Sequence, residues 1–110
     1  MAKRDGSRSS DEQVINKQAE YVLRLFVTGA SPNSTRAISN IKRICEQYLK
    51  DRYSLEIIDV YQQHELAKKE QIVALPLLIK QSPEPSRRLV GDMADEKKVL
   101  NGLGVIQSHG

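Results

Sequence analysis

The chain has 110 residues, enough for one domain with a hydrophobic core and too few for a second. Its 17 lysine and arginine residues against 14 acidic residues give a net charge of +3, far below the one-sided charge typical of nucleic-acid or polybasic membrane binding. One cysteine excludes an internal disulfide, and no apolar run approaches the roughly 18 residues of a membrane span. We therefore expect a cytoplasmic protein without nucleic-acid or membrane partners.

The first 20 residues contain four basic and four acidic side chains and few apolar ones. Such a segment buries too little apolar surface to offset the entropy lost on ordering. We predict a flexible N-terminal arm over residues 1–18. A single domain is expected over residues 19–110.

Residues 21–28, YVLRLFVT, carry apolar side chains on both faces and predict an inner strand. Ser31 followed by Pro32 is typical of a helix start, because proline at the first helical position loses no hydrogen bond. Apolar residues at three-and-four spacing predict a helix to about residue 50, with one buried stripe. The stripe consists of Ala37, Ile38, Ile41, Ile44, Cys45, Tyr48 and Leu49.

A second strand over residues 55–60 completes a parallel βαβ unit. The rest of the chain is less regular. We predict a weak helix over residues 64–73 whose stripe includes Val73, short strands at 77–80 and 87–90, and irregular structure at 82–86. Asp92 and Asp95 resemble a capping box that opens a last helix through Leu103.

This order of elements, with Pro76 just before the third strand, resembles the thioredoxin fold. In that fold the reactive cysteines stand at the start of the first helix, where this chain has residues 30–33, ASPN. Cys45 lies further along the apolar stripe and is expected to be an inert core thiol. Ser31 is explained more simply as a helix cap than as the activator of a thiol cofactor.

Two histidines, His64 and His109, provide neither a metal-ligand set nor a general base beside a nucleophile. We therefore expect no cofactor, no metal site and no enzymatic activity. The basic residues Lys80, Arg87 and Arg88 form either a recognition patch or a solvated edge that protects an open strand.

Several strings of residues resemble, in order and spacing, the KaiB family of circadian-clock proteins. They are YVLRLFVTGASPNSTRAI, SLEIIDV, ALPLL, PEPSRRLVGDM and EKKVLNGL. The similarity runs without a gap from residue 21 to residue 105. The resemblance implies an α/β KaiB fold with a thioredoxin-like βαβ N-terminal half and a potentially fold-switching C-terminal half.

The resemblance also implies a non-enzymatic regulator that binds a KaiC-family ATPase and modulates circadian-type or stress-response timing. Its implied partner-binding residues are Arg36, Lys80, Arg87 and Arg88. Its implied fold-switch positions are Pro76, Pro83, Pro85, Gly102 and Gly104. The alternative is a thioredoxin-like stress-response adaptor that has lost KaiC binding and has no redox activity.

The chain departs from the family pattern in ways that indicate a divergent paralogue. His64 stands where proline is usual, Glu84 interrupts a run of prolines, and Gly104 replaces an aspartate. We expect a homotetramer, with residues 61–105 in the ground-state arrangement of the family and the thioredoxin-like monomer as a minor population. Gly102→Ala should favour helix by about 1 kcal/mol and shift the chain toward monomer.

Overall fold

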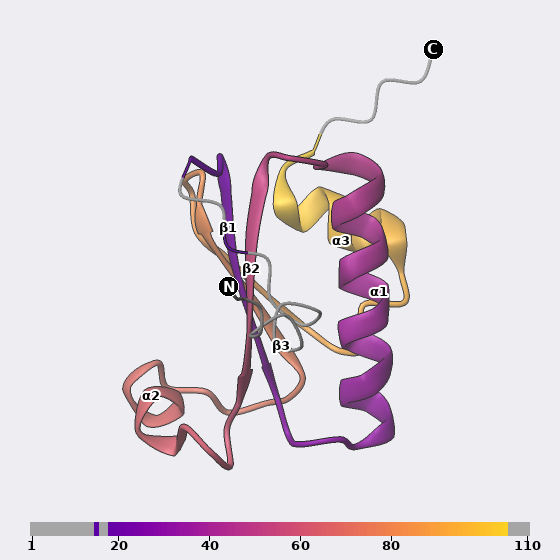
Figure 1. The fold of residues 1–110 in the computed structure, drawn as a ribbon. Helices are drawn as coiled ribbons and strands as arrows, with labels where there is room; N and C mark the ends of the chain where they lie inside the picture. Colours follow the sequence, from indigo (N-terminus) through magenta and orange to yellow (C-terminus); the bar gives the residue numbers. More distant parts are fainter. Residues whose placement is uncertain (1–14, 16–17, 106–110) are drawn as a thin grey trace, which may run out of the picture.

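The computed structural model describes residue 15 and residues 18–105. Its elements are β1 (Tyr21–Val27), α1 (Pro32–Tyr48), β2 (Tyr53–Asp59), α2 (His64–Lys69), β3 (Leu77–Ser82), β4 (Arg87–Val90) and α3 (Glu96–Leu103). The four strands form one sheet in the order β2-β1-β3-β4. Helices α1 and α3 cover one face of this sheet, and α2 lies near one end of the other face (Figure 1).

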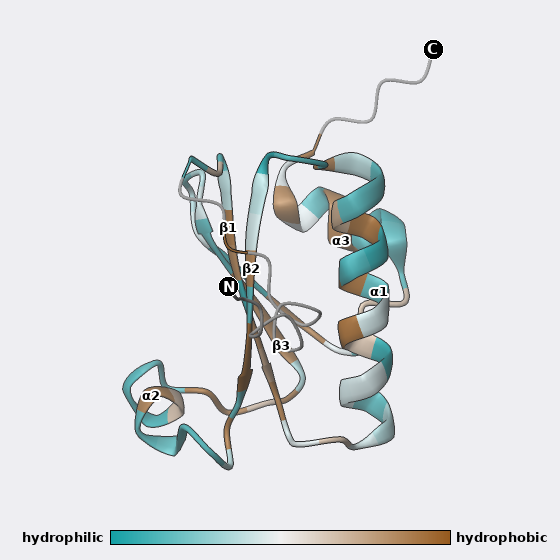
Figure 2. Ribbon diagram, viewed as in Figure 1, coloured by the Kyte–Doolittle hydropathy of each residue, from teal (hydrophilic) through white to brown (hydrophobic). Residues whose placement is uncertain are grey.

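Strand β1 lies in the interior of the sheet, which confirms the prediction of an inner strand. It runs parallel to β2 and antiparallel to β3. Leu25 packs into the core under α1 and α3, whereas Phe26 packs into a second cluster on the α2 side. Both side chains are fully buried. Figure 2 shows hydrophobic stretches along the strands at the centre of the sheet.

Helix α1 begins as the sequence predicts and ends at Tyr48, two residues before the expected end near residue 50. The Ser31 side chain caps it by accepting a hydrogen bond from the Ser34 N–H, and Pro32 occupies the first turn. Its apolar stripe faces the sheet and includes Ala37, Ile41 and Ile44, all with no exposed surface. A single amphipathic face is therefore enough to fix the orientation of this helix.

Two predictions for the second half are wrong in detail. Val73 is not part of a buried stripe, because α2 ends at Lys69 and the Val73 side chain is 95% exposed. The cap of α3 is Asp95, whose carboxylate accepts from the Lys98 N–H at 3.2 Å. Asp92 does not cap α3, because its carboxylate accepts from the Ala94 N–H and contacts an arginine of α1. The predicted edge strand at 87–90 is confirmed as β4.

The second half of the chain has the thioredoxin-like arrangement in this structure, and not the ground-state arrangement that we expected. Strand β3 pairs antiparallel with β1, with Leu78 opposite Leu25. Leu100 and Leu103 of α3 enter the same core as α1. Burial of these leucines on the α1 side of the sheet accounts for the position of α3. The predicted arm at 1–18, apart from residues 15 and 18, and the C-terminal residues 106–110 lie outside the described residues.

Two glycines fit α3 to its surroundings. Gly104 ends the helix with a φ of +79°, a left-handed conformation that side chains other than those of Asn and Asp rarely adopt. Gly102 faces β4, and a Cβ atom there would lie 2.6 Å from the methyl carbons of Leu89. This contact opposes the gain in helix propensity on which our expectation for Gly102→Ala depends.

The Gly102 and Leu89 contact gives a double-mutant test of the arrangement. We expect Gly102→Ala to be about 1 kcal/mol more favourable in a Leu89→Ala background than in the native chain, because the smaller side chain removes the clash. Urea unfolding of the four chains measures this coupling. Additive effects of the two substitutions would contradict the close approach of α3 to β4.

Candidate partner-binding surface

The start of α1, where thioredoxin-like proteins hold reactive cysteines, is occupied by hydroxyl groups in this chain. Ser34 has no exposed surface, and its Oγ accepts from the Thr28 N–H at 3.0 Å and from the Ser31 Oγ at 2.9 Å. The Thr28 Oγ1 lies 3.1 Å from the Ser31 Oγ. These groups satisfy one another and cap the helix, so the site has a structural role.

Cys45 lies in the main core with no exposed surface, as predicted. Burial raises the pKa of its thiol from 9.0 to about 12, and the neighbouring Glu46 carboxylate adds to this rise. Thiols react as thiolates, which this thiol does not form near neutral pH. The lack of thiol and disulfide chemistry stays a prediction that this burial supports.

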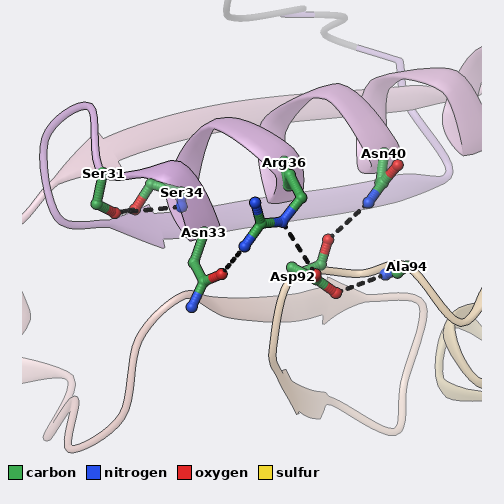
Figure 3. A network of polar contacts seen from close by, with 7 residues as sticks. All are labelled: Ser31, Asn33, Ser34, Arg36, Asn40, Asp92 and Ala94. Atoms are coloured by element: carbon green, nitrogen blue, oxygen red, sulfur yellow. Dashed lines mark hydrogen bonds and ion pairs between the residues drawn. The ribbon is translucent and has the colours of Figure 1, made fainter.

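Arg36 joins α1 to the segment that precedes α3 (Figure 3). Its Nε lies 3.3 Å from the Asp92 Oδ2, and its Nη2 donates to the Asn33 side chain. The Asn40 side chain donates to the backbone oxygen of Asp92 at 2.9 Å. Arg36 is half exposed, so a partner can reach it, but its charge is already paired.

Lys80 is buried, contrary to the recognition role that the resemblance implies for it. Only 4% of its surface is exposed, because residue 80 points to the same face of the sheet as Leu78 and lies beneath α3. Its Nζ donates to the backbone oxygen of Leu103 at 3.3 Å. Burial lowers the pKa of this amine, and the positive charge of Arg87 lowers it further.

Arg87 and Arg88 do not form one patch, because consecutive residues of a strand point to opposite faces. In the register of β3 and β4, Arg87 lies opposite Lys80 on the α3 side, and Arg88 lies opposite Ile79 on the α2 side. The Arg88 Nη2 donates to the Glu70 backbone oxygen at 2.8 Å and lies 3.6 Å from its carboxylate. Arg87 is exposed and has no acidic partner among the described residues.

A row of charged groups crosses the α2 side of the sheet. The Arg24 Nε lies 3.3 Å from the Glu56 carboxylate on the neighbouring strand, and its Nη1 lies 3.7 Å from the Glu70 carboxylate. Glu70 therefore stands between Arg24 and Arg88. Sequence reasoning missed this row, although the alternation of β1 places Arg24 on the same face as Phe26.

The predicted fold-switch prolines lie near the β3 ends and the turn to β4. Pro76 is buried, and its backbone oxygen accepts from the Gly91 N–H at 3.0 Å. Pro83 and Pro85 lie in the turn, and all three prolines follow cis peptide bonds. The structure brings Pro76 close to the end of β4 but places the other two prolines at the opposite end of β3.

A polar hollow of about 900 Å³ lies between α1 and the carboxyl ends of β1 and β2. Asp59 lines it and shapes its rim by accepting from the N–H groups of Gly29 at 3.3 Å and Tyr61 at 2.9 Å. His64 is exposed at the start of α2. Within the described part of the chain, no three His, Cys, Asp or Glu side chains cluster as metal ligands would.

The comparisons with known proteins agree with this geometry. The chain matches the family described as KaiB domain over residues 24–105. It is 51% identical to the circadian clock protein KaiB3 of Synechocystis over 77% of this chain and 83% of that protein. It is 45% identical to the circadian clock oscillator protein KaiB of Prochlorococcus marinus over 78% of this chain and 80% of that protein.

Solved structures with the same fold include mitochondrial thioredoxin 3 of Saccharomyces cerevisiae, with a TM-score of 0.65, 13% identity and 82% coverage of both chains. The N-terminal domain of Synechococcus elongatus SasA has a TM-score of 0.63 and 23% identity, covering 84% of this chain and 90% of that domain. No helix in the described segments is long and apolar enough to cross a membrane.

The fold and the start of α1 define a thioredoxin-like α/β protein in which residues 30–33, ASPN, contain no cysteine. The family match over residues 24–105 and the 51% identity with KaiB3 identify the family within this fold. The chain belongs to the KaiB family.

The buried thiol predicts a stability change at high pH. The pKa of Cys45 is about 12 in the folded chain and near 9.0 when the thiol is exposed, so its contribution to stability is complete below pH 9 and decreases as the pH rises toward 12. We expect the loss of unfolding free energy between pH 8 and pH 11 to be smaller in Cys45→Ala than in the native chain, as urea unfolding will measure. Equal losses would mean that the thiol titrates alike in both states.

Proposed function

We propose that this chain is a non-enzymatic regulator that binds the ring of a KaiC-family ATPase and modulates circadian-type or stress-response timing. The observation that carries the proposal is the KaiB-domain match over residues 24–105. The names of its relatives as circadian clock proteins support a role in timing. The burial of Cys45 and the hydroxyl groups at the start of α1 favour binding over thiol chemistry.

The open edge of β4 is the surface best suited to this partner. Strand β4 is the last strand of the sheet in the described part of the chain, so no described strand pairs with its outer backbone groups. Arg87 is exposed there without an acidic partner among the described residues, and Arg88 is half exposed beside it. Arginines at such an edge can form paired hydrogen bonds with carboxylates of the ATPase. Arg36, on α1, is a second contact in this proposal.

Charge reversal at Arg87 tests the surface. We expect Arg87→Glu to weaken the complex with the KaiC-family ATPase of the same organism by about 2 kcal/mol or more, because an attractive charge pair becomes repulsive. Lys97→Glu is the matched control. Lys97 is exposed on α3, and this substitution changes the net charge by the same amount as Arg87→Glu. Calorimetry with and without ATP measures the affinity, and circular dichroism checks the fold of each variant.

Two outcomes of this experiment exclude parts of the proposal. Equal affinity of Arg87→Glu and Lys97→Glu would remove Arg87 from the interface. Failure of the native chain to bind the ATPase would favour the adaptor that has lost KaiC binding.

We also propose the homotetramer and the fold switch of residues 61–105. Exposed apolar side chains in this half support self-association, since Tyr61, Val73 and Val90 are 72%, 95% and 53% exposed. Light scattering at micromolar concentrations should show a tetramer. A monomer over that range would contradict the assembly.

A further inference from the structure

Helix α2 is too short to be stable without the rest of the fold. It has six residues, and no side chain caps its start. An isolated helix of this length is unstable in water, because forming the first turn costs more than the few hydrogen bonds return. Figure 1 shows α2 near one end of the sheet, on the face opposite α1 and α3. Contacts with the sheet therefore have to hold α2 in place.

Helix α2 and the residues that follow it cover a small apolar cluster. The cluster consists of four buried side chains of the strands, Phe26, Ile58, Leu77 and Ile79. Leu66 of α2 and Ile72 beyond its end pack against this cluster, and both are only partly buried. Movement of α2 away from the sheet would therefore expose apolar side chains that are now shielded from water.

The backbone just after α2 is strained. Gln71 has a φ of +58°, in the left-handed region that a glutamine rarely adopts. Its N–H donates to the Lys68 oxygen at 3.0 Å, and the Ile72 N–H donates to the Ala67 oxygen at 3.0 Å. This turn ends the helix and lets Ile72 pack on the cluster. The covered state has a conformational cost that other contacts must offset.

Glu70, at the end of α2, is held by two arginines of the sheet. One of its carboxylate oxygens lies 3.7 Å from the Arg24 Nη1 of β1, and the other lies 3.6 Å from the Arg88 Nη2 of β4. The same Arg88 nitrogen donates to the Glu70 backbone oxygen at 2.8 Å. A negative charge at the C-terminal end of a helix is unfavourable on its own. Glu70 therefore stabilises α2 through these arginines and not through the helix dipole.

We propose that residues 64–75 form a lid over the Phe26 cluster, closed by a clasp that consists of the ion pairs of Glu70 with Arg24 and Arg88. The lid opens while α1 and the sheet stay folded, and the opening exposes one apolar face of the sheet. Ionic strength controls the lid, because dissolved ions screen the two ion pairs. This device lies within the chain and goes beyond the proposed function, which concerns a partner.

Removal of one negative charge tests the clasp. Glu70→Gln loses both ion pairs, and Glu65→Gln is the matched control because Glu65 is exposed in the first turn of α2 with no ion pair among the described residues. We expect the amides of Ala67 and Ile72 to be about fivefold less protected from hydrogen exchange in Glu70→Gln than in Glu65→Gln. The helix dipole alone predicts the opposite order, since it favours Glu65 and disfavours Glu70. Equal protection, or lower protection in Glu65→Gln, would overturn the clasp.

The same spectra test whether the opening is local. In the native chain we expect the amide of Ile44, in the buried part of α1, to be about tenfold or more better protected than that of Ile72, because the lid opens without global unfolding. Equal protection of the two amides would overturn the lid, since the whole chain would then open in one step.

A salt series provides a second measurement that does not depend on how a variant folds. At about 1 M sodium chloride the screening length falls to about 3 Å, which is shorter than either distance within the clasp. We expect the protection of Ile72 in the native chain to fall toward its value in Glu70→Gln, while Glu70→Gln itself responds much less. Equal responses of the two chains to salt would overturn the ionic control of the lid.

Discussion

The structure depends on burial of β1 on both of its faces. Leu25 and Phe26 are adjacent in sequence and fully buried on opposite sides of the sheet. This double burial requires neighbours on both edges of β1 as well as cover on both faces. Strands β2 and β3 supply the edges, α1 and α3 cover the Leu25 side, and the segment around α2 covers Phe26. The positions of β2, β3, α1 and α3 follow from this strand.

The same alternation decides what the basic residues can do. Arg87 and Arg88 are consecutive on an edge strand, so each faces a different part of the molecule. Arg88 forms an ion pair with Glu70, which also forms one with Arg24. These two ion pairs link the end of α2 to the sheet. Helix α2 has no fully buried residue, and its position is fixed by packing of the partly buried Leu66 against the cluster around Phe26 together with these charge contacts. Arg87 has no such role and is available to a partner.

The sequence predicts the first half of the fold better than the second, and the physical reason is the density of apolar residues. The α1 stripe repeats over four turns and leaves one orientation for that helix, and Ser31 with Pro32 marks its start. Beyond residue 60 the apolar runs are short, so the pattern does not determine how the second half packs. The sequence does not show which of Asp92 and Asp95 caps the helix, and the contacts of the Asp92 carboxylate with the Ala94 N–H and Arg36 give Asp92 another role.

At the candidate site, too, the sequence pattern alone does not show which side chains are buried. The position of Lys80 two residues after Leu78 was the signal that its side chain faces the core, but a lysine at the end of an apolar run is also typical of an exposed strand end. The start of α1 and the end of α3 differ in how many hydrogen bonds their polar groups make. At the start of α1, the Ser31 hydroxyl donates to the Ser34 hydroxyl and accepts from the Ser34 N–H, so the two side chains are bonded to each other. At the end of α3, the Lys80 amine donates to the backbone oxygen of Leu103, and no carboxylate of the described residues pairs with this buried amine.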